Sequence, residues 1–94
     1  MAQLLTNTEI QTQAKSLSPD WTVEGSNLQI TRKFKDFIAA IEFVNKLVEP
    51  AESSGHHPDI EISYNQVKIN LTSHDAGGLT QKDFDLAAII SQIS

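Results

Sequence analysis

Apolar residues alternate with polar ones in two parts of the chain, at residues 28–31 and at residues 60–71. A period of two is typical of β-strands that bury one face. Gly25, Ser26 and Asn27 directly precede the first region, and Asn65 and Gln66 interrupt the second. Glycine and asparagine favour turns. The pattern therefore predicts two β-hairpins, one over residues 21–34 and one over residues 60–71, the second turning at Asn65 and Gln66.

Three other stretches have the spacing of three to four residues that is typical of amphipathic helices. The first begins at Thr6, with Glu9 completing a capping box, and ends before the next proline. The last begins at Thr80, with Asp83 in the same capping-box position. The middle helix is long: Asp36 caps it, and it fades between residues 50 and 55. Its expected buried stripe comprises Phe37, Ile41, Val44 and Val48, widened by Ile38 and Leu47.

The predicted order of elements is αββαββα. Strands connected as hairpins form an antiparallel sheet, here of four strands, and each strand has one apolar face that needs a cover. Three amphipathic helices can cover one face of this sheet. We therefore expect an α+β fold, a two-layer sandwich that forms a single domain over residues 1–94. The other sheet face, or an edge, stays open to a ligand or a second subunit.

The composition limits the compartment and the partners. Ninety-four residues form one modest core, so self-association would add buried surface. Cysteine is absent, which excludes disulfides and thiolate chemistry and fits a reducing compartment. The net charge of −5 and the scattered basic residues argue against direct binding to nucleic acid or to an anionic membrane. Without a signal-peptide pattern or a long apolar run, a cytoplasmic protein is expected.

Candidate chemistry is concentrated in the three histidines, His56, His57 and His74. Pro58 favours extended backbone at His57, so the adjacent pair belongs to the entrance of a strand. In an antiparallel hairpin the end of the second strand returns to the start of the first, which predicts that all three imidazoles meet at one end of the sheet. If the preceding helix reaches this point, Glu52 at i−4 is positioned to accept a hydrogen bond from His56 and fix its tautomer.

Each candidate also has an ordinary structural interpretation. A single surface histidine is most often solvated, Glu52 would be a surface charge at a helix end, and Pro58 a residue that starts a strand. Asp83 has a sufficient role in the capping box of the last helix. Trp21, the only tryptophan, is more typical of a core or an interface than of a ligand site. The convergence of three histidines is what favours a functional site.

Three imidazoles with nearby carboxylates are compatible with two chemistries. Zinc or another transition metal takes histidine nitrogen and carboxylate oxygen, although adjacent histidines seldom chelate one ion. Imidazole is also a general acid and base, with a pKa of about 6.5 and a ring that both donates and accepts. A dehydration needs one proton delivered to a hydroxyl and another withdrawn next to it. Two histidines, with a third that holds the substrate, suffice for this without a cofactor.

The spacing of these residues resembles the motif of the pterin-4a-carbinolamine dehydratases. The motif residues are Glu52, His56, His57, Pro58, Tyr64, His74 and Asp83. Further similar segments are "DW" at 20–21, "FKDFIAAIEFV" at 34–44, "YNQVKINLTSH" at 64–74 and "GLT" at 78–80. The resemblance covers nearly the whole chain, and the family's fold, a four-stranded antiparallel sheet with helices on one side, is the one that periodicity predicts.

The resemblance implies a lyase without cofactor or metal. Such enzymes remove water from 4a-hydroxytetrahydrobiopterin and yield quinonoid dihydropterin in tetrahydropterin recycling. It implies that His56 and His74 are the acid–base groups, with either one as the acid, and that His57 binds the pterin. The supporting residues that it implies are Glu52, Pro58 and Asp83, with Trp21 as a wall of the site.

The resemblance also implies partners. Family members form dimers or tetramers, and some serve as proteins that stabilise the dimer of a transcription factor. A second interpretation of this chain therefore stays open, namely a non-catalytic binding module or dimerisation cofactor of a protein partner. An intact set of histidines favours the enzyme.

Overall fold

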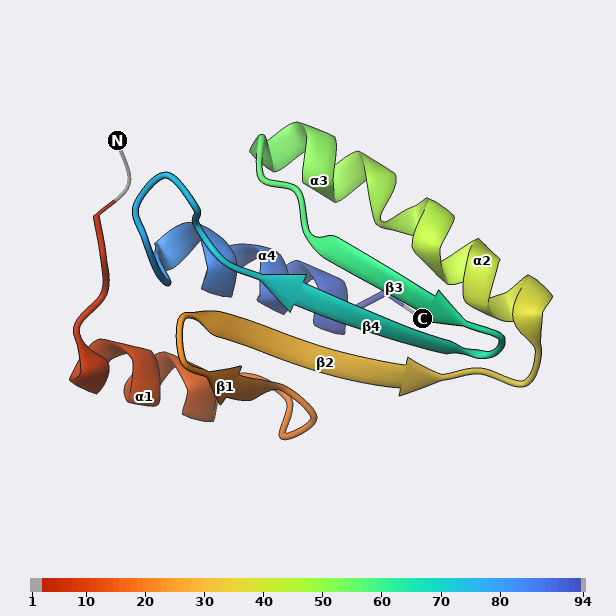
Figure 1. Ribbon diagram of the computed structural model, residues 1–94, viewed down its shortest axis with the longest axis horizontal. Coiled ribbons are helices and arrows are strands. Elements are labelled where there is room, and N and C mark those ends of the chain that lie inside the picture. The colour runs from red at the N-terminus through yellow and green to blue at the C-terminus, as the bar shows by residue number, and fades with distance from the viewer. Residues whose placement is uncertain (1–2, 94) are drawn as a thin grey trace.

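The computed structural model describes residues 3–93, which form a four-stranded antiparallel sheet with its helices on one side (Figure 1). The strand order is β1-β2-β4-β3. Among residues 3–93, none of the helices has the length and apolar character of a membrane span. The predicted α+β sandwich and its order αββαββα are confirmed, with the second helix divided in two. The elements are α1 (Asn7–Ser16), β1 (Thr22–Glu24), β2 (Asn27–Lys33), α2 (Phe37–Lys46), α3 (Val48–Ser54), β3 (Asp59–Ser63), β4 (Gln66–Leu71) and α4 (Gln81–Ser91).

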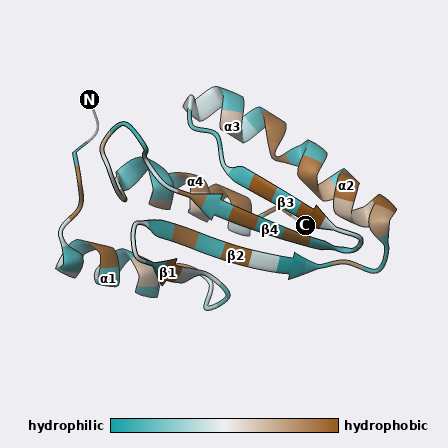
Figure 2. Ribbon diagram, viewed as in Figure 1, coloured by the Kyte–Doolittle hydropathy of each residue, from teal (hydrophilic) through white to brown (hydrophobic). Residues whose placement is uncertain are grey.

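The sheet has one apolar and one polar face, as the alternation along its strands requires. Figure 2 shows this alternation along β2 and β4. The apolar side chains of these strands meet those of α4, which lies behind them in Figure 1. Each buried aliphatic side chain contributes roughly 1.5–3 kcal/mol to folding. The central core residues are Leu28, Ile30, Val67, Ile69 and Leu71 from the sheet and Phe84, Leu86 and Ile90 from α4.

The second helical segment is interrupted at Leu47. Asp36 caps α2 as predicted, because its carboxylate accepts the backbone N–H of Ala39 at 2.8 Å. Pro50 has no N–H to donate to the carbonyl of Lys46, so the regular hydrogen-bond ladder cannot continue through this point. α3 nevertheless continues past Pro50 to position 54. The prediction of one long helix is therefore wrong in that the segment is two helices, whereas its end at Ser54 lies within the predicted range of residues 50–55.

α2 and α3 bury a different stripe from the predicted one. The buried residues are three or four positions apart, so they satisfy the helical period as well as the predicted set does. Two of them are alanines, whose small side chains allow close packing but give a weak apolar signal in the sequence. The buried stripe comprises Ala40, Phe43, Leu47 and Ala51, with Pro50 also buried beside it; Leu47 is the one predicted residue among them. Of the other predicted residues, Phe37, Ile38 and Val48 are exposed and Ile41 and Val44 are half-buried.

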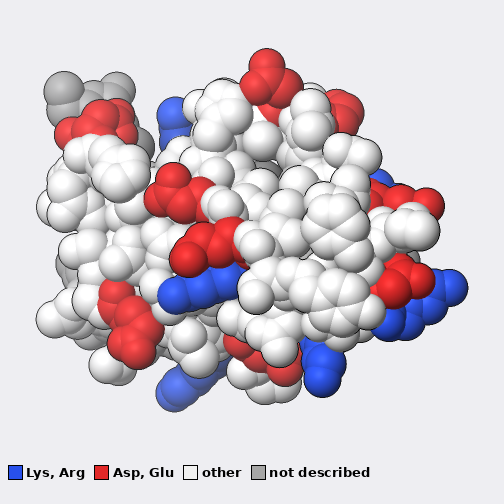
Figure 3. Space-filling view, turned by 45° about the vertical axis from the view of Figure 1, so that its right-hand side comes forward, with Lys and Arg blue, Asp and Glu red and all other residues white. Residues whose placement is uncertain are grey.

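β3 is an edge strand that the helices leave largely uncovered. All of its residues are exposed, including Ile60 (36%) and Ile62 (40%), which pair with buried residues of β4 and point to the same face as they do. A groove of about 190 Å³ between β3 and the α2–α3 pair has a mainly apolar lining. In Figure 3, uncharged side chains form a continuous area on this side, with charged residues around it. The open edge expected from the sequence is therefore β3.

The turn of the second hairpin occupies Tyr64 and Asn65, one position earlier than predicted. Ser63 pairs with Gln66, so only two residues connect the strands. Asn65 is fixed here because its side-chain amide donates to the carbonyl of Phe34 (2.9 Å), while its own carbonyl accepts the Phe34 N–H (2.7 Å). Tyr64 takes the left-handed conformation, with φ of 51°. The register still brings the end of β4 beside the start of β3.

Two side chains hold the C-terminal end of α4. Arg32 donates to three carbonyl oxygens in and just after the last turn, at 2.5 to 3.4 Å, and its guanidinium lies 5.1 Å from the ring centroid of Phe43. The indole of Trp21 donates to the hydroxyl of Ser91 at 2.7 Å. A cation at this end of a helix also complements the helix dipole. α4 is thus anchored at the end that lies away from the histidines.

Replacing Arg32 by methionine is expected to lower the free energy of unfolding by about 2 kcal/mol. The change keeps apolar bulk but removes the donors to the helix carbonyls and the cation over the Phe43 ring. Urea unfolding measures the loss. Lys33→Met, at the next position and exposed, is the control and should change stability by less than about 0.5 kcal/mol. Similar losses in both variants would contradict the anchoring role.

Candidate active site

The site begins where α3 ends. Gly55 has a φ of 64°, a left-handed conformation that glycine adopts without the cost that other residues incur. The backbone N–H of His56 then donates back to the carbonyl of Ala51 at 3.2 Å, which closes the helix. The chain leaves in the extended direction that Pro58 imposes on the residue before it. His56 and His57 consequently lie in the short connection that leads into β3.

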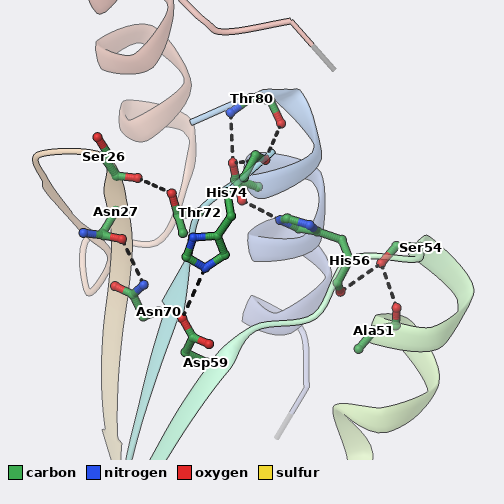
Figure 4. A network of polar contacts seen from close by, with 12 residues as sticks. Ser26, Asn27, Ala51, Ser54, His56, Asp59, Asn70, Thr72, His74 and Thr80 are labelled. Atoms are coloured by element: carbon green, nitrogen blue, oxygen red, sulfur yellow. Dashed lines mark hydrogen bonds and ion pairs between the residues drawn. The ribbon is translucent and has the colours of Figure 1, made fainter. Parts of the chain in front are cut away.

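His56 is paired with the buried carboxylate of Asp83. Its Nε2 lies 2.5 Å from Oδ1, and the two side chains are 13% and 0% exposed. The other carboxylate oxygen, Oδ2, accepts the backbone N–H of Thr80 and the hydroxyl of Ser73, each at 2.9 Å (Figure 4). An ionised carboxylate is an acceptor only, so Nε2 carries the proton and Nδ1 of neutral His56 keeps a lone pair. A carboxylate placed in this way fixes the tautomer of the imidazole.

Glu52 pairs with His57 rather than with His56. Its Oε2 lies 2.5 Å from Nε2 of His57, and both side chains are exposed. The predicted contact with His56 is wrong because Gly55 turns the chain out of the helix, so positions four apart no longer share a face. Glu52, His57 and Pro58 line part of the apolar groove beside β3.

His74 follows β4 and lies at the same end of the hairpin as His56 (Figure 4). It is 83% exposed, and its Nε2 is 4.0 Å from Oδ2 of Asp59, the first residue of β3. Backbone hydrogen bonds between Ser73 and Gly78 close the loop that carries it. Each of the three histidines therefore faces a carboxylate of its own.

Trp21 lies away from this cluster. It is a core residue, 6% exposed, and bonds to Ser91. Ser91 and Asp83 are just over two turns apart on α4, about 12 Å along its axis. Tyr64, in the turn of the second hairpin, is at the opposite end of that hairpin from His74. The structure gathers the histidines and their carboxylates at one end of the sheet, without these two aromatic residues.

The arrangement is suited to moving protons. Within residues 3–93 there is no group of three or more His, Asp or Glu side chains placed to hold one metal ion. Instead, the imidazole–carboxylate pairs are separate, and every buried side-chain nitrogen or oxygen in this range has a hydrogen-bond partner. A partly buried imidazole with a fixed tautomer thus lies near an exposed imidazole that a ligand can reach.

Two residues of this site are missing from the sequence prediction. Asp59 becomes a neighbour of His74 only through the register of β3 and β4, and the sequence prediction placed the turn that sets this register one position too late. Ser73 does have a signal. The inward alternation of β4 continues to position 73, where a serine replaces the expected apolar residue. A polar residue at an inward position indicates a buried partner, which here is Asp83.

The fold and the paired histidines define a small α+β protein with three imidazole–carboxylate pairs at one end of its sheet. Comparison with known proteins is more specific. The profile of the family described as pterin 4 alpha carbinolamine dehydratase matches residues 3–93. A protein from Nostoc sp. (strain PCC 7120), provisionally named pterin-4-alpha-carbinolamine dehydratase, is 78% identical over 94 residues and 100% of both chains. One from Acidobacterium capsulatum, with the same provisional name, is 50% identical over 99% of both chains. The chain belongs to the pterin 4 alpha carbinolamine dehydratase family.

Solved structures share the fold. One described as a transcriptional coactivator/pterin dehydratase from Brucella melitensis has a TM-score of 0.86 and 30% identity, over 92% of this chain and 93% of that one. Another, a pterin dehydratase-like protein identified as a RuBisCO assembly factor in the α-carboxysome, has a TM-score of 0.60 and 21% identity, over 76% and 82%. The second likeness shows the fold alone.

His56→Ala is expected to lower the free energy of unfolding by roughly 1–3 kcal/mol, because Asp83 would stay buried and lose one of its three hydrogen-bond partners. His74→Ala should change it by less than about 0.5 kcal/mol, since that side chain is 83% exposed. Urea unfolding followed by the fluorescence of Trp21 measures both. Equal stabilities of the two variants would show that the buried pair does not stabilise the fold.

Proposed function

We propose that this protein dehydrates 4a-hydroxytetrahydrobiopterin to quinonoid dihydropterin, without metal or cofactor, as a step of tetrahydropterin recycling. The observation that carries the proposal is the pair formed by His56 and buried Asp83, with His74 at the same end of the sheet. Membership of the family and the provisional names of its relatives support the same reaction.

The reaction needs two proton movements on neighbouring atoms of the pterin. The hydroxyl on C4a is protonated and leaves as water, while the proton on N5 is withdrawn and the C4a–N5 double bond forms. We assign the withdrawal to His56, because its Nδ1 lone pair is available and Asp83 stabilises the resulting imidazolium. His74 is assigned as the acid. Each positioned group contributes roughly 10²–10⁴ in rate.

Pterin binding is assigned to His57. Glu52 holds its imidazole at 2.5 Å, and Pro58 and the apolar groove provide an uncharged surface beside it. Binding and proton transfer would then use different histidines, and the adjacent His56 and His57 are held by different carboxylates, Asp83 and Glu52. Trp21 has no part in the proposed site, because it is enclosed in the core.

Self-association through β3 is a further part of the proposal. An edge strand presents unpaired backbone groups, and here its apolar residues Ile60 and Ile62 are also partly exposed. Val48 of α3 lines the apolar groove together with Ile60, and Phe37 and Ile38 are further exposed apolar side chains on α2. A second copy of the chain, in a dimer or a tetramer, would cover both.

A binding role is the second candidate function. The relative from Brucella melitensis is described as a transcriptional coactivator as well as a pterin dehydratase, and the open edge at β3 offers a surface for a protein partner. On this alternative the chain is a non-catalytic binding module or a dimerisation cofactor. One assay distinguishes the two functions.

Purified protein is expected to accelerate loss of the 4a-carbinolamine that a phenylalanine hydroxylase generates in situ, followed by ultraviolet absorbance. The acceleration should survive a chelator. His56→Ala and His74→Ala should each lower turnover at least about tenfold, and Lys33→Met, at the far end of the sheet, should not. Loss of the rate with chelator would support metal chemistry, and wild-type rates in both variants would remove the acid–base assignment. No acceleration at all would favour the binding module.

Ile62→Lys is expected to make the protein monomeric, because it places a charge in the surface that a second copy would cover. Sedimentation velocity compares it with the wild type, which should be a dimer or a tetramer. Thr31→Lys, which adds the same charge on the open polar face of β2, is the matched control and should keep the wild-type assembly. A monomeric wild type at micromolar concentration would contradict self-association.

A further inference from the structure

We propose that Ser73 is a positioning residue that fixes His56 and His74 relative to each other. The inference rests on the proposed function, which assigns both histidines as acid–base groups. Ser73 is 2% exposed and lies between the end of β4 and the loop that carries His74. Its side chain acts on one histidine and its backbone acts on the other.

The side chain of Ser73 orients the partner of His56. Its hydroxyl donates to Oδ2 of Asp83 at 2.9 Å and lies 2.8 Å from the hydroxyl of Thr80. Because the single Ser73 proton is used on Asp83, Thr80 donates in the second contact. Two donors on Oδ2, from Ser73 and from the Thr80 backbone, set the rotation of the carboxylate. Oδ1 is thereby directed at Nε2 of His56.

The backbone of Ser73 holds the loop of His74. Its carbonyl accepts the N–H groups of Ala76, Gly77 and Gly78 at 3.0, 2.9 and 3.3 Å, and its N–H donates to the carbonyl of Gly78 at 3.1 Å. Gly77 allows this tight path because it has a φ of 81°. The same residue therefore holds the loop that carries His74 and orients the carboxylate of Asp83.

Capping of α4 does not explain the serine. Thr80 and Asp83 form the capping box between themselves, and an apolar residue at position 73 would leave that box intact. It would also continue the apolar inward side of β4. A buried hydroxyl is costly unless its hydrogen bonds are made. What the hydroxyl adds is the second donor to Oδ2, which matters for the direction of Oδ1 and hence for the tautomer of His56.

Ser73→Ala removes the hydroxyl and keeps the backbone. Turnover number is expected to fall about tenfold while KM changes less than about twofold, because the effect is on proton transfer and not on pterin binding. The ¹⁵N chemical shifts of the neutral His56 ring should show Nε2 protonated in the wild type and a mixture of tautomers in the variant. Ser73→Thr and Ser73→Val, which share one shape, test the hydroxyl alone: threonine should keep the Nε2 tautomer and most of the turnover, and valine should not.

Ser91→Ala is the matched control. It removes a serine hydroxyl at the other end of α4, where that group accepts from Trp21 and donates to the carbonyl of Ala87. Stability should fall without a change in tautomer or turnover. A wild-type tautomer and turnover in both Ser73→Ala and Ser73→Val would overturn the proposal. A changed tautomer in a protein whose wild type has no dehydratase activity would support positioning by Ser73 and refute the proposed function.

Discussion

A carboxylate without exposed surface is the constraint on which both the fold and the site depend. Asp83 accepts three hydrogen bonds, and a buried charge that loses such partners is strongly destabilising. The donors come from three places in the chain: Ser73 just after β4, Thr80 at the start of α4, and His56 between α3 and β3. One side chain therefore joins segments that are distant in sequence. The histidine site lies where the elements must meet for Asp83 to be satisfied.

The two ends of α4 have different structural roles. Arg32 and Trp21 bind its C-terminal end to the core, and its N-terminal end presents Asp83 to His56. The same framework occurs in a RuBisCO assembly factor that shares 21% of its residues in the aligned region, so the fold by itself does not determine the function. On the proposed function, the chemistry of this chain comes from the set of imidazole–carboxylate pairs at one end of the sheet.

Signals that act within a few residues made most of the framework predictable. The helix caps at Thr6, Asp36 and Thr80 and the two hairpins follow from local spacing, and the common end of the histidines follows from hairpin topology. Non-local choices were not predictable in this way. Which apolar stripe of α2 is buried depends on the sheet beneath it, and the partner of Glu52 depends on the backbone direction set at Gly55. The only sequence signal for the burial of Ser73 is that a serine interrupts the apolar inward positions of β4.

The strand order has a consequence for the way the chain acquires its structure. β4 lies between β2 and β3 and is nevertheless the last strand in sequence, so β3 has no partner strand and β2 has only β1 until β4 is present. Pairings between β2 and β4 span a large part of the chain, and such contacts slow folding because a long loop must close first. Asp83 and α4 follow later still. The four-stranded sheet is therefore complete only when β4 is in place, and a fragment that ends before β4 lacks the strand that joins β3 to the rest of the sheet.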